Sequence, residues 1–543
     1  MTVETIDLEL CNGCGVCVDS CSVDVLRLDT SANEGRESPP CQLACPAGVD
    51  MRRYVHLLRE GMIEEALDVL RDTLPLPAIT GRICPHPCET ECARKDVDEA
   101  VNINSLERFV ADYGPREKAR PVRKIYASKV AIIGSGPAGL AAAYDLAKMG
   151  YPVTVFESMP VLGGMLRVGV PEHRLPKEVL DAEIKYINDL GVEFKTSITL
   201  GKNMTLTDLK SQGFQSVFLA LGAQLSRKPD IPGIKIDGVL WGLDFLQDAN
   251  LKRKTSIKGR VLVIGGGNVA IDVALTALRL GAKEVQLACL ESREEMPAYE
   301  EEIQQALDEG VIVNVSCGPR RILGDAGEKV SGVELIGCTS VIDNKGKFNP
   351  CYDENVNNTI KTDTVILAIG RASDLSLVPE GIKTTREGTI KVDPITLETT
   401  LPGVFAGGEI TSAQGVAIDA IAAGKKAAVS IDCYLKGNDL KAGRGEKQRI
   451  VGNTPREHME ELPRQRTPLL PVNKRHHNFK EVKTGFNDDM MLLEARRCTT
   501  CGSRVIIKYP EECMACDSCE LNCPKDAIYV SPERYAPLMV GWR

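Results

Sequence analysis

The sequence predicts an α/β protein with two parallel sheets, joined to a helical segment and to short cysteine-rich ends. Residues 129–435 alternate apolar strands with amphipathic helices and place glycine turns between them, the pattern of parallel sheets. Within this region a glycine fingerprint occurs twice, each time between an apolar run and a helical run. Fifteen of the twenty cysteines lie outside it, in tight clusters toward the two ends. These observations predict two nucleotide folds flanked by metal-binding modules.

Composition and charge narrow the class of protein. The formal net charge is −9 and no long basic stripe is present, so nucleic-acid binding is disfavoured. The first residues lack the basic end and the apolar core of a signal peptide. The apolar stretch 261–278 contains Asn268 and Asp272, which predicts a strand, a turn and a helix, not a membrane span. We therefore expect a soluble, cytoplasmic protein.

The first fingerprint follows an apolar run directly and has G-x-G-x-x-G spacing. The first glycine permits a tight turn, the second lets the backbone approach a pyrophosphate, and the third lets helix and strand pack closely. The N-terminus of the following helix then faces the phosphate charge. An acid at the end of the next strand can accept a hydrogen bond from a ribose hydroxyl. The candidate residues are Gly134, Gly136, Pro137, Ala138, Gly139 and Glu157.

A second fingerprint has G-x-G-x-x-A spacing, and an acid again stands just past the next strand. Two Rossmann-like dinucleotide-binding folds in one chain predict two dinucleotides that exchange a hydride. A degenerate copy that serves only packing is the alternative, and it is disfavoured because both fingerprints are intact. The candidate residues of the second site are Gly265, Gly267, Asn268, Val269, Ala270 and Glu291.

Three segments resemble the small subunit of glutamate synthase and the corresponding region of dihydropyrimidine dehydrogenase. They are GGMLRVGVPEHRLPK (163–177), DTVILAIGR (363–371) and GVFAGGEITSAQGVAIDAIAAGKKAA (403–428). The resemblance covers roughly residues 38–435 and extends into the last fifty residues. It implies that the first fingerprint holds FAD. It also implies that the second, in a domain inserted into the FAD domain, holds NADH or NADPH.

The same resemblance implies further cofactor contacts. Gly408 and Glu409 would contact the ribityl–phosphate chain of the flavin, although the family usually has Asp at the position of Glu409. The helix that starts near Val416 would direct its positive end at the isoalloxazine and stabilise the reduced flavin. The implied residues are Gly164, Arg167, Gly222, Gly408, Glu409, Gly415, Val416 and Ala417 for FAD, and Gly370 for NAD.

The residues after the second strand of the inserted domain favour NADH over NADPH. Relatives that use NADPH are arginine-rich there, because cations pair with the 2′-phosphate. Here the corresponding residues are Leu290 and Glu291, and a carboxylate attracts a ribose hydroxyl but repels a phosphate. Arg293 lies two residues further on and could still accommodate NADPH.

Both ends of the chain have the cysteine spacing of bacterial ferredoxins. Zinc sites usually pair two C-x-x-C knuckles across a loop, and disulfide frameworks suit small secreted domains, so we expect 4Fe–4S clusters. Either the two ends dock as halves of one ferredoxin and exchange their fourth ligands, or each holds its own cluster. The two sets are Cys11, Cys14, Cys17 and Cys21, and Cys513, Cys516, Cys519 and Cys523.

The resemblance also implies a helical iron–sulfur domain. Relatives have an RCLxC segment just before this domain, which the chain lacks at that place. The chain has EARRCTTCG near its C-terminus, so we expect that segment to fold back and supply Cys498 and Cys501. Alignment with the family puts Glu107 at the remaining ligand position. The cysteines within the helical domain are Cys41, Cys45, Cys84, Cys88 and Cys92. Fifteen cysteines and one carboxylate then provide sixteen ligands, enough for four clusters.

The expected domain order follows from these assignments. A ferredoxin-like 4Fe–4S module at 1–30 precedes the helical iron–sulfur domain at 38–125. The FAD domain occupies 129–245 and 363–435, with the NAD(P)H domain between them at 246–362. A connector at 436–495 leads to the C-terminal ferredoxin-like module at 496–543.

The assignments predict an electron-transferring oxidoreductase. NADH or NADPH would give hydride to FAD, and single electrons would pass through the clusters to a larger oxidoreductase subunit or a ferredoxin, in a direction that can reverse. We expect a hetero-oligomer, and no side chain that acts as a general acid or base. Residues 129–435 lack a C-x-x-C, which disfavours a disulfide reductase of the thioredoxin-reductase kind. The alternatives are the small subunit of a glutamate synthase, and a redox sensor or scaffold without turnover.

Overall fold

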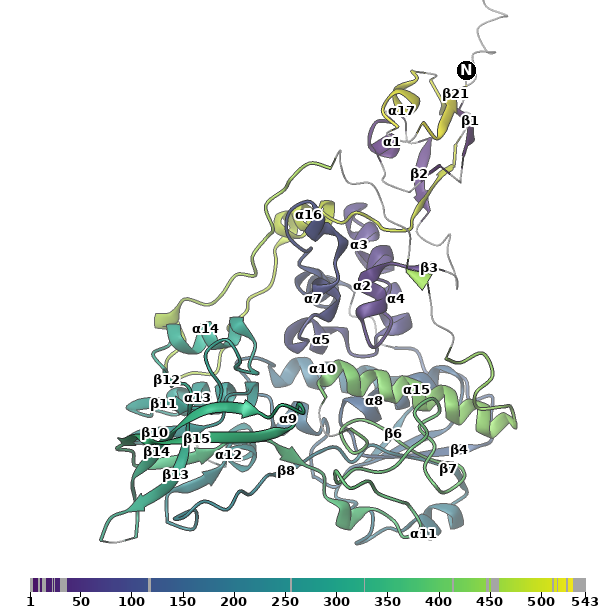
Figure 1. The fold of residues 1–543 in the computed structure, drawn as a ribbon. Coiled ribbons are helices and arrows are strands. Elements are labelled where there is room, and N and C mark those ends of the chain that lie inside the picture. The colour runs from purple at the N-terminus through teal and green to yellow at the C-terminus, as the bar shows by residue number, and fades with distance from the viewer. Residues whose placement is uncertain are drawn as a thin grey trace, which may run out of the picture. The chain divides into compact units, whose positions relative to one another are not determined.

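The computed structural model divides the chain into two compact units, and each is described by itself (Figure 1). The cysteine unit comprises 1–117, 443–467 and 485–543, and the nucleotide unit comprises 118–442 and 468–484. The described residues are 3–7, 10–11, 16–21, 23, 25–29, 37–115, 119–253, 256–326, 328–412, 415–445, 449–450, 459–509, 512–514, 516–523 and 526–530.

The nucleotide unit contains a first parallel sheet of five strands in the order β18, β7, β4, β5, β6. The strands are β4 (Lys129–Ile133), β5 (Val153–Phe156), β6 (Glu193–Lys195), β7 (Phe214–Leu219) and β18 (Val404–Ala406). The helices are α8 (Pro137–Lys148), α9 (Met165–Val168), α10 (Lys177–Asp189), α11 (Leu206–Ser211) and α15 (Ala417–Lys436), and a 3₁₀ turn, η2, spans Leu375–Leu377. A long stretch of chain separates β7 from its neighbour β18, and that stretch forms a second fold.

The second fold is a five-stranded parallel sheet in the order β12, β11, β10, β16, β9. Its strands are β9 (Val239–Trp241), β10 (Arg260–Ile264), β11 (Glu284–Ala288), β12 (Ile312–Asn314) and β16 (Thr364–Leu367), and its helices are α12 (Gly242–Asn250), α13 (Asn268–Arg279) and α14 (Glu300–Asp308). The chain enters and leaves it through a short antiparallel ladder of β8 (Leu225–Ser226) and β17 (Arg371–Ala372). The second fold is therefore inserted into the first. It includes β9 and β16, which lie outside the expected range 246–362.

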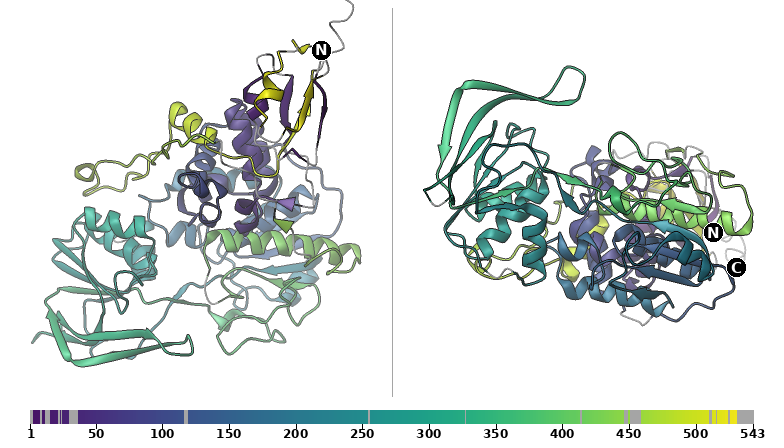
Figure 2. Two further views of the ribbon diagram at one scale, coloured as in Figure 1. Left: turned by 45° about the horizontal axis from the view of Figure 1, so that its top comes forward. Right: turned by 90° about the horizontal axis from the view of Figure 1, so that it is seen from below.

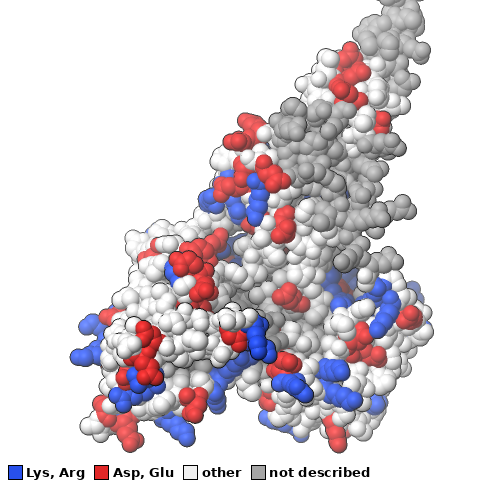
Figure 3. Space-filling view, viewed as in Figure 1, with Lys and Arg blue, Asp and Glu red and all other residues white. Residues whose placement is uncertain are grey.

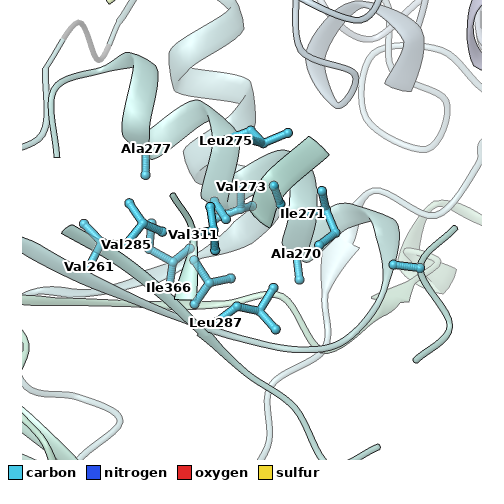
Figure 4. Packing of buried hydrophobic residues seen from close by; sticks show 14 of the residues in the cluster. Val261, Ala270, Ile271, Val273, Leu275, Ala277, Val285, Leu287, Val311 and Ile366 are labelled. Atoms are coloured by element: carbon cyan, nitrogen blue, oxygen red, sulfur yellow. The ribbon is translucent and has the colours of Figure 1, made fainter. Parts of the chain in front are cut away.

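The core of the second fold lies between α13 and the sheet, where apolar side chains of both interlock (Figure 4). Val261, Val285 and Leu287 point toward α13, which contributes Ile271 and Ala274. The intervening strand residues, Leu262 and Ile264 among them, pack in a second cluster with the antiparallel sheet described next. Both faces of β10 and β16 are buried, which explains why residues 261–264 and 365–367 are continuously apolar. In β11 the apolar Val285 and Leu287 alternate with the partly exposed Glu284 and Gln286.

An antiparallel sheet of three strands completes the second fold. It consists of β13 (Cys317–Gly324), β14 (Val330–Ile342) and β15 (Phe348–Ile360), with β14 in the middle. The β14–β15 hairpin is long, and Figure 2 shows it extending from the parallel sheet. Its inner end contributes Val333 and Leu335 to the core, whereas Phe348 near the tip is 70% exposed.

Residues 468–484, which we call the strap, pack on the second fold and contain the 3₁₀ turn η3 (Val472–Lys474). Arg475 reaches Glu309 at the end of α14, with 3.2 Å between Nη1 and Oε1. Arg279 of α13 binds the same carboxylate at 2.7 Å, and all three side chains are at most 3% exposed. The backbone N–H of Val482 also donates to the carbonyl oxygen of His173, 3.0 Å away. One buried acid with two cations thus anchors the strap.

The cysteine unit contains a group of short helices. They are α2 (Pro40–Ala44), α3 (Met51–Arg59), α4 (Ile63–Thr73), α5 (Pro77–Ile83), α6 (Pro87–Thr90), the 3₁₀ turn η1 (Ala93–Asp96) and α7 (Ile103–Tyr113). From the far end of the sequence, α16 (Asp488–Arg496) packs against α3 and α7. Apolar residues at helical spacing, such as Tyr54, Leu70 and Phe109, form the interior between the helices. A two-residue ladder also pairs β3 (Glu37–Ser38) with β19 (Arg449–Ile450).

The two chain ends build one module in the same unit. β1 (Val3–Ile6) pairs with β21 (Ile528–Val530), and β2 (Leu26–Asp29) pairs with β20 (Arg504–Ile507), both antiparallel. The short helices α1 (Val16–Asp19) and α17 (Ser518–Leu521) belong to the same module. A shared core draws residues from both ends, including Leu26 and Ile528. Each half alone is too short to bury such a core, and docking supplies the missing surface.

None of the helices in the described residues has both the length and the hydrophobicity that crossing a membrane requires. On the face shown in Figure 3, acidic and basic side chains are interspersed over the described surface.

The strap anchor can be tested by replacing Glu309. The variant Glu309→Gln leaves two buried guanidinium groups without a counterion, and we expect it to cost about 3–5 kcal/mol locally. Hydrogen exchange of the α14 and strap amides measures this opening free energy directly, without assuming that the whole chain unfolds in one step. The control is Glu301→Gln, because Glu301 pairs with Lys483 of the strap but is 65% exposed. Glu301→Gln should lower the local opening free energy by less than about 1 kcal/mol. Equal losses in the two variants would show that Glu309 does not anchor the strap.

Candidate redox-cofactor sites

The first glycine loop joins the end of β4 to the start of α8. Gly134 has a φ of 109°, which a residue with a side chain rarely adopts. A β-carbon at Gly139 would overlap the carbonyl oxygen of Gly134, so the helix starts directly against the loop. Pro137 is the first residue of α8 and Ala138 the second. This places the N-terminus of a twelve-residue helix over the loop, a geometry suited to a phosphate.

Two distant segments meet this loop. A β-carbon added at Gly164 would lie 2.8 Å from Cα of Gly136, so these two glycines are in close contact. Gly408 lies beside Ala138, since an added β-carbon would be 3.2 Å from its side chain. Gly415 and Val416 precede α15, whose first residue is Ala417. The predicted FAD residues on three segments therefore lie around one loop, and Gly222 follows β7 with a φ of 69°.

Glu157 accepts hydrogen bonds from residues of the first glycine loop and its surroundings. It is 5% exposed, and its Oε2 accepts hydrogen bonds from the backbone N–H and the hydroxyl of Ser135, at 3.0 and 2.6 Å. Its Oε1 accepts from the N–H of Met159 at 2.9 Å. Its Oε1 also accepts from the hydroxyl of Ser158 at 3.1 Å, so four hydrogen bonds occupy the roughly four lone-pair sites of the carboxylate. Glu157 therefore holds the loop in shape, a contribution that the sequence pattern did not predict.

Two charged residues predicted for FAD have protein partners. Arg167 donates to the carbonyl oxygen of Leu162 at 3.0 Å and pairs with Asp181. Glu409 pairs with Arg371 in β17, and burial raises the pKa of Glu409 while this arginine opposes the rise. Sequence reasoning missed Arg371, although it is the last residue of the matched segment DTVILAIGR. It ties the chain returning from the second fold to the flavin-side loop.

The matched segment 163–177 connects the two nucleotide folds. Arg174 binds Asp272 of α13, with 2.7 Å between Nη1 and Oδ2, and pairs with Glu302 of α14. The Nδ2 group of Asn250 donates to the carbonyl oxygen of Val168 at 2.9 Å. These bonds bring the segment from the first fold against three helices of the second. The sequence pattern indicated that the segment is important but not that it bridges two folds.

The second glycine loop repeats the first geometry between β10 and α13. Gly265 has a φ of 139°, and Gly267 precedes the first helical residue, Asn268. The side-chain oxygen of Asn268 accepts a hydrogen bond from the N–H of Tyr299 at 2.9 Å. Ala270 is fully buried and Val269 partly buried against the core, and Gly370 leaves this fold with a φ of 114°.

Glu291 lies against this second loop. A β-carbon added at Gly266 would be 2.7 Å from its Oε2, so the carboxylate faces the glycines. Arg293, the cation that could accommodate a 2′-phosphate, pairs with Glu300 through two contacts of 2.9 and 2.6 Å. The second loop therefore has the carboxylate of Glu291 beside it, whereas the guanidinium of Arg293 is paired with Glu300.

Four cysteines from three segments line one cavity in the cysteine unit. They are Cys41, Cys92, Cys498 and Cys501, with Arg52, Met51 and Val55 of α3 in the same wall. Burial raises the pKa of the Cys41 thiol, and the neighbouring thiols of Cys498, Cys92 and Cys501 raise it further. The expected fold-back of the C-terminal pair is thus present in the structure, and we call this cavity the thiol pocket.

A buried arginine holds the fold-back in place. The side chain of Arg497 is fully buried and binds Glu494 at 2.6 Å and Asp98 at 2.8 Å. It also donates to the carbonyl oxygens of Ala100 and Leu462. Glu494 in turn accepts from the N–H of Asn102 at 2.7 Å and from that of Gln465 at 2.6 Å. We call this set of ionic and hydrogen bonds the arginine latch.

A second group contains the other helical-domain cysteines. Burial, Glu107, the Cys45 thiol and Glu89 raise the pKa of Cys84. Burial, the same two carboxylates and the thiols of Cys84 and Cys45 raise the pKa of Cys88. Glu107 also raises the pKa of Cys45. Glu107 itself is 7% exposed, its Oε1 has no hydrogen-bond partner, and burial raises its pKa to about 8. An orphaned, buried carboxylate oxygen among three thiols fits a metal-ligand role.

The terminal module brings cysteines of both ends together. Cys11, Cys17, Cys21, Cys513, Cys519 and Cys523 contribute to its core, whereas Cys516 is exposed and Cys14 lies outside the described residues. Burial raises the pKa of Cys519 to about 11, and Cys21 of the other chain end raises it further. Among the described residues, no three candidate ligands close around a single metal ion.

Comparison with known proteins identifies related families and folds. The family described as pyridine nucleotide-disulphide oxidoreductase matches residues 128–427, the dihydropyrimidine dehydrogenase domain II 4Fe-4S family matches 35–119, and a 4Fe-4S binding domain matches 4–27. The NADP(+)-dependent formate dehydrogenase subunit beta of Moorella thermoacetica is 38% identical over 85% of this chain and 70% of its own length. The glutamate synthase [NADPH] small chain of Escherichia coli is 33% identical over 74% and 89%.

A solved structure shows the same fold for the nucleotide region. Mycobacterium tuberculosis FprA in complex with NADPH superposes with a TM-score of 0.50 at 19% identity. The match covers 59% of this chain and 87% of that chain.

The arginine latch can be tested with Arg497→Met. The variant leaves the fully buried carboxylate of Glu494 without a cation, whereas Asp98 keeps Arg94 as its partner. We expect α16 to lose about 3–5 kcal/mol of local stability, because the charge of Glu494 stays buried. Hydrogen exchange of the α16 amides reports this loss. The control is Arg466→Met, because Arg466 pairs with Glu99 but both side chains are largely exposed, at 71% and 49%. Its effect should not exceed about 1 kcal/mol. Unchanged exchange in Arg497→Met would show that other contacts hold α16.

Proposed function

Because the chain belongs to the pyridine nucleotide-disulphide oxidoreductase family, we propose that its two nucleotide folds hold FAD and NADH and that its cysteine unit holds four 4Fe–4S clusters. The chain is an NAD(P)H-dependent FAD and iron–sulfur oxidoreductase that acts as an electron-transfer subunit. When bound, these groups supply hydride transfer and its separation into single electrons. The residues of the chain bind and orient them.

The flavin site is assigned to the first glycine loop and its neighbours. The loop amides and the start of α8 bind the pyrophosphate, and Glu157 keeps the loop in position. A hydroxyl of the adenosine ribose would take the place of the Ser158 hydroxyl as a donor to Oε1 of Glu157. Gly164 and Gly408 let their segments come close to the loop, because a side chain at either position would meet Gly136 or Ala138. Arg371 fixes Glu409 so that the loop before α15 stays in place. The N-terminus of α15 then faces the flavin ring and favours its reduced form.

The cysteine unit is assigned four clusters. The thiol pocket supplies Cys41, Cys92, Cys498 and Cys501, and the second group supplies Cys45, Cys84, Cys88 and Glu107. In the terminal module, the proximity of Cys21 to Cys519 supports an exchange of fourth ligands between the two ends. The thiol pocket carries the proposal, because it collects cysteines that lie more than 400 residues apart in the sequence.

The names of the relatives bear on the partner of this chain. The relatives described above are a beta subunit and a small chain, which supports a hetero-oligomer with a larger partner. We propose that electrons from the nucleotide unit leave through the clusters to that partner or to a ferredoxin. A glutamate synthase small subunit is the second candidate, favoured by the similarity to the E. coli chain. Co-purification of a large glutaminase-bearing partner would support it.

The nucleotide preference can be tested by steady-state kinetics with NADH and NADPH. We expect a higher kcat/KM for NADH, because Glu291 faces the loop where a 2′-phosphate would need a cation. The variant Glu291→Arg should shift the preference toward NADPH by about tenfold or more, as about 1.4 kcal/mol of altered charge pairing implies. The control Glu300→Gln frees Arg293 without adding a cation, and it should move the preference less. A higher kcat/KM of the unmodified protein for NADPH would contradict the assignment.

The cluster count can be tested by metal analysis of anaerobically prepared protein. We expect one FAD and about sixteen iron atoms per chain, since each cubane holds four. The double variant Cys498→Ala/Cys501→Ala should lose about four of them, because a cluster with two empty corners is labile. The control Cys433→Ala, in α15, should lose none. Stoichiometric zinc, or full iron in the double variant, would contradict the four-cluster proposal.

A further inference from the structure

Arg52 occupies an unusual place in the wall of the thiol pocket. It is the second residue of α3 and is only 5% exposed. Its Nη1 donates to the carbonyl oxygen of Cys501 at 3.5 Å, and its Nη2 lies 3.8 Å from the Asp50 carboxylate. Its Nε is buried and has no hydrogen-bond partner. A guanidinium that is removed from water normally has all its donors satisfied.

Other buried arginines of the same unit show what a purely structural role looks like. Arg497 binds two acids and three carbonyl oxygens, and Arg94 pairs with Asp98 and donates to the carbonyl oxygens of Arg497 and Glu460. Arg52 has a single long bond to a carbonyl and a distant acid. Its incomplete bonding, in a wall that also contains four thiols, points to a partner that belongs inside the pocket.

The two cysteine groups differ in the charged side chains beside their thiols. The thiol pocket has the guanidinium of Arg52 in its wall, with the partly exposed Asp50 beside it. Burial raises the pKa of Cys498 and Arg59 opposes that rise, whereas burial and Glu89 both raise the pKa of Cys92. The second group has the carboxylates of Glu107 and Glu89 among its thiols, with Arg464 paired to Glu89. A fixed cation stabilises a group that gains an electron, whereas a fixed anion destabilises it.

We infer that Arg52 is a positioning residue that raises the reduction potential of the cluster held by Cys41, Cys92, Cys498 and Cys501. The inference rests on the ligand set proposed above. Its guanidinium would donate hydrogen bonds to the sulfur atoms of the cluster, and its charge would favour the state with one additional electron. No bond to the metal is made or broken. The cluster in the thiol pocket would then accept electrons more readily than the one beside Glu107.

The test is a redox titration of the holoenzyme followed by electron spin resonance. The pocket signal is assigned first, as the one that Cys498→Ala/Cys501→Ala removes. In Arg52→Gln the oxidised form should be favoured about tenfold, which lowers the midpoint potential of a one-electron couple by 59 mV. Arg52→Lys keeps the positive charge but loses the planar set of guanidinium donors. Its midpoint potential should therefore fall less than that of Arg52→Gln. Both variants should retain the iron content of the unmodified protein.

The control is Arg82→Gln, because Arg82 is as buried as Arg52 but binds Asp112 at 2.9 Å and does not line the pocket. It should leave the potential unchanged even if it costs stability. An unchanged potential in Arg52→Gln, with iron retained, overturns the inference while the proposed ligand set stands. If no signal is lost in the double cysteine variant, the ligand set fails and the inference fails with it.

Discussion

The buried pairing of Arg497 with Asp98 and Glu494 is the constraint on which the cysteine unit depends. It fastens a segment from near the C-terminus to helices built from residues 40–113. Arg497 lies directly before Cys498 and Cys501, which provide half of the thiols in the pocket that Cys41 and Cys92 also line. Removing one partner from a fully buried pair is costly, because the remaining charge cannot return to water. The latch therefore makes the geometry of a redox site depend on a contact that is not part of it.

In the nucleotide unit, short glycine loops and a few side-chain contacts position the two candidate sites. Each glycine loop starts a helix directly at the end of a strand, which leaves backbone amides as the chemical groups facing a phosphate. The side chains that surround the loops mainly maintain their shape, as Glu157 does through Ser135. Arg371 and Arg174 then connect the two folds, one at the flavin-side loop and one at α13. Both sites thus rest on backbone geometry supported by a few ionic contacts.

Much of this could be predicted from the sequence, and the exceptions have physical reasons. The structure has the expected insertion of one fold in the other and the expected fold-back of Cys498 and Cys501. The pairing of the chain ends agrees with one of the two alternatives for the terminal modules. The short strands β9 and β16 lie in the second sheet, beyond the boundaries expected for it, because three or four apolar residues carry no sign of which sheet they will join. Arg52 gave no signal either, since a lone arginine on a helix normally faces solvent.

The local chemistry could be predicted from the order of the amino acids: the glycine spacing that permits a phosphate loop, the acid after each second strand, and the ferredoxin spacing of the terminal cysteines. Those features act over a few residues, and backbone sterics and ligand spacing set them directly. Which cysteines share a cavity, and that Glu107 is buried with an unpartnered oxygen, could be known only from the folded structure. Burial and charge pairing depend on residues far apart in the chain, so they are settled when those segments pack together.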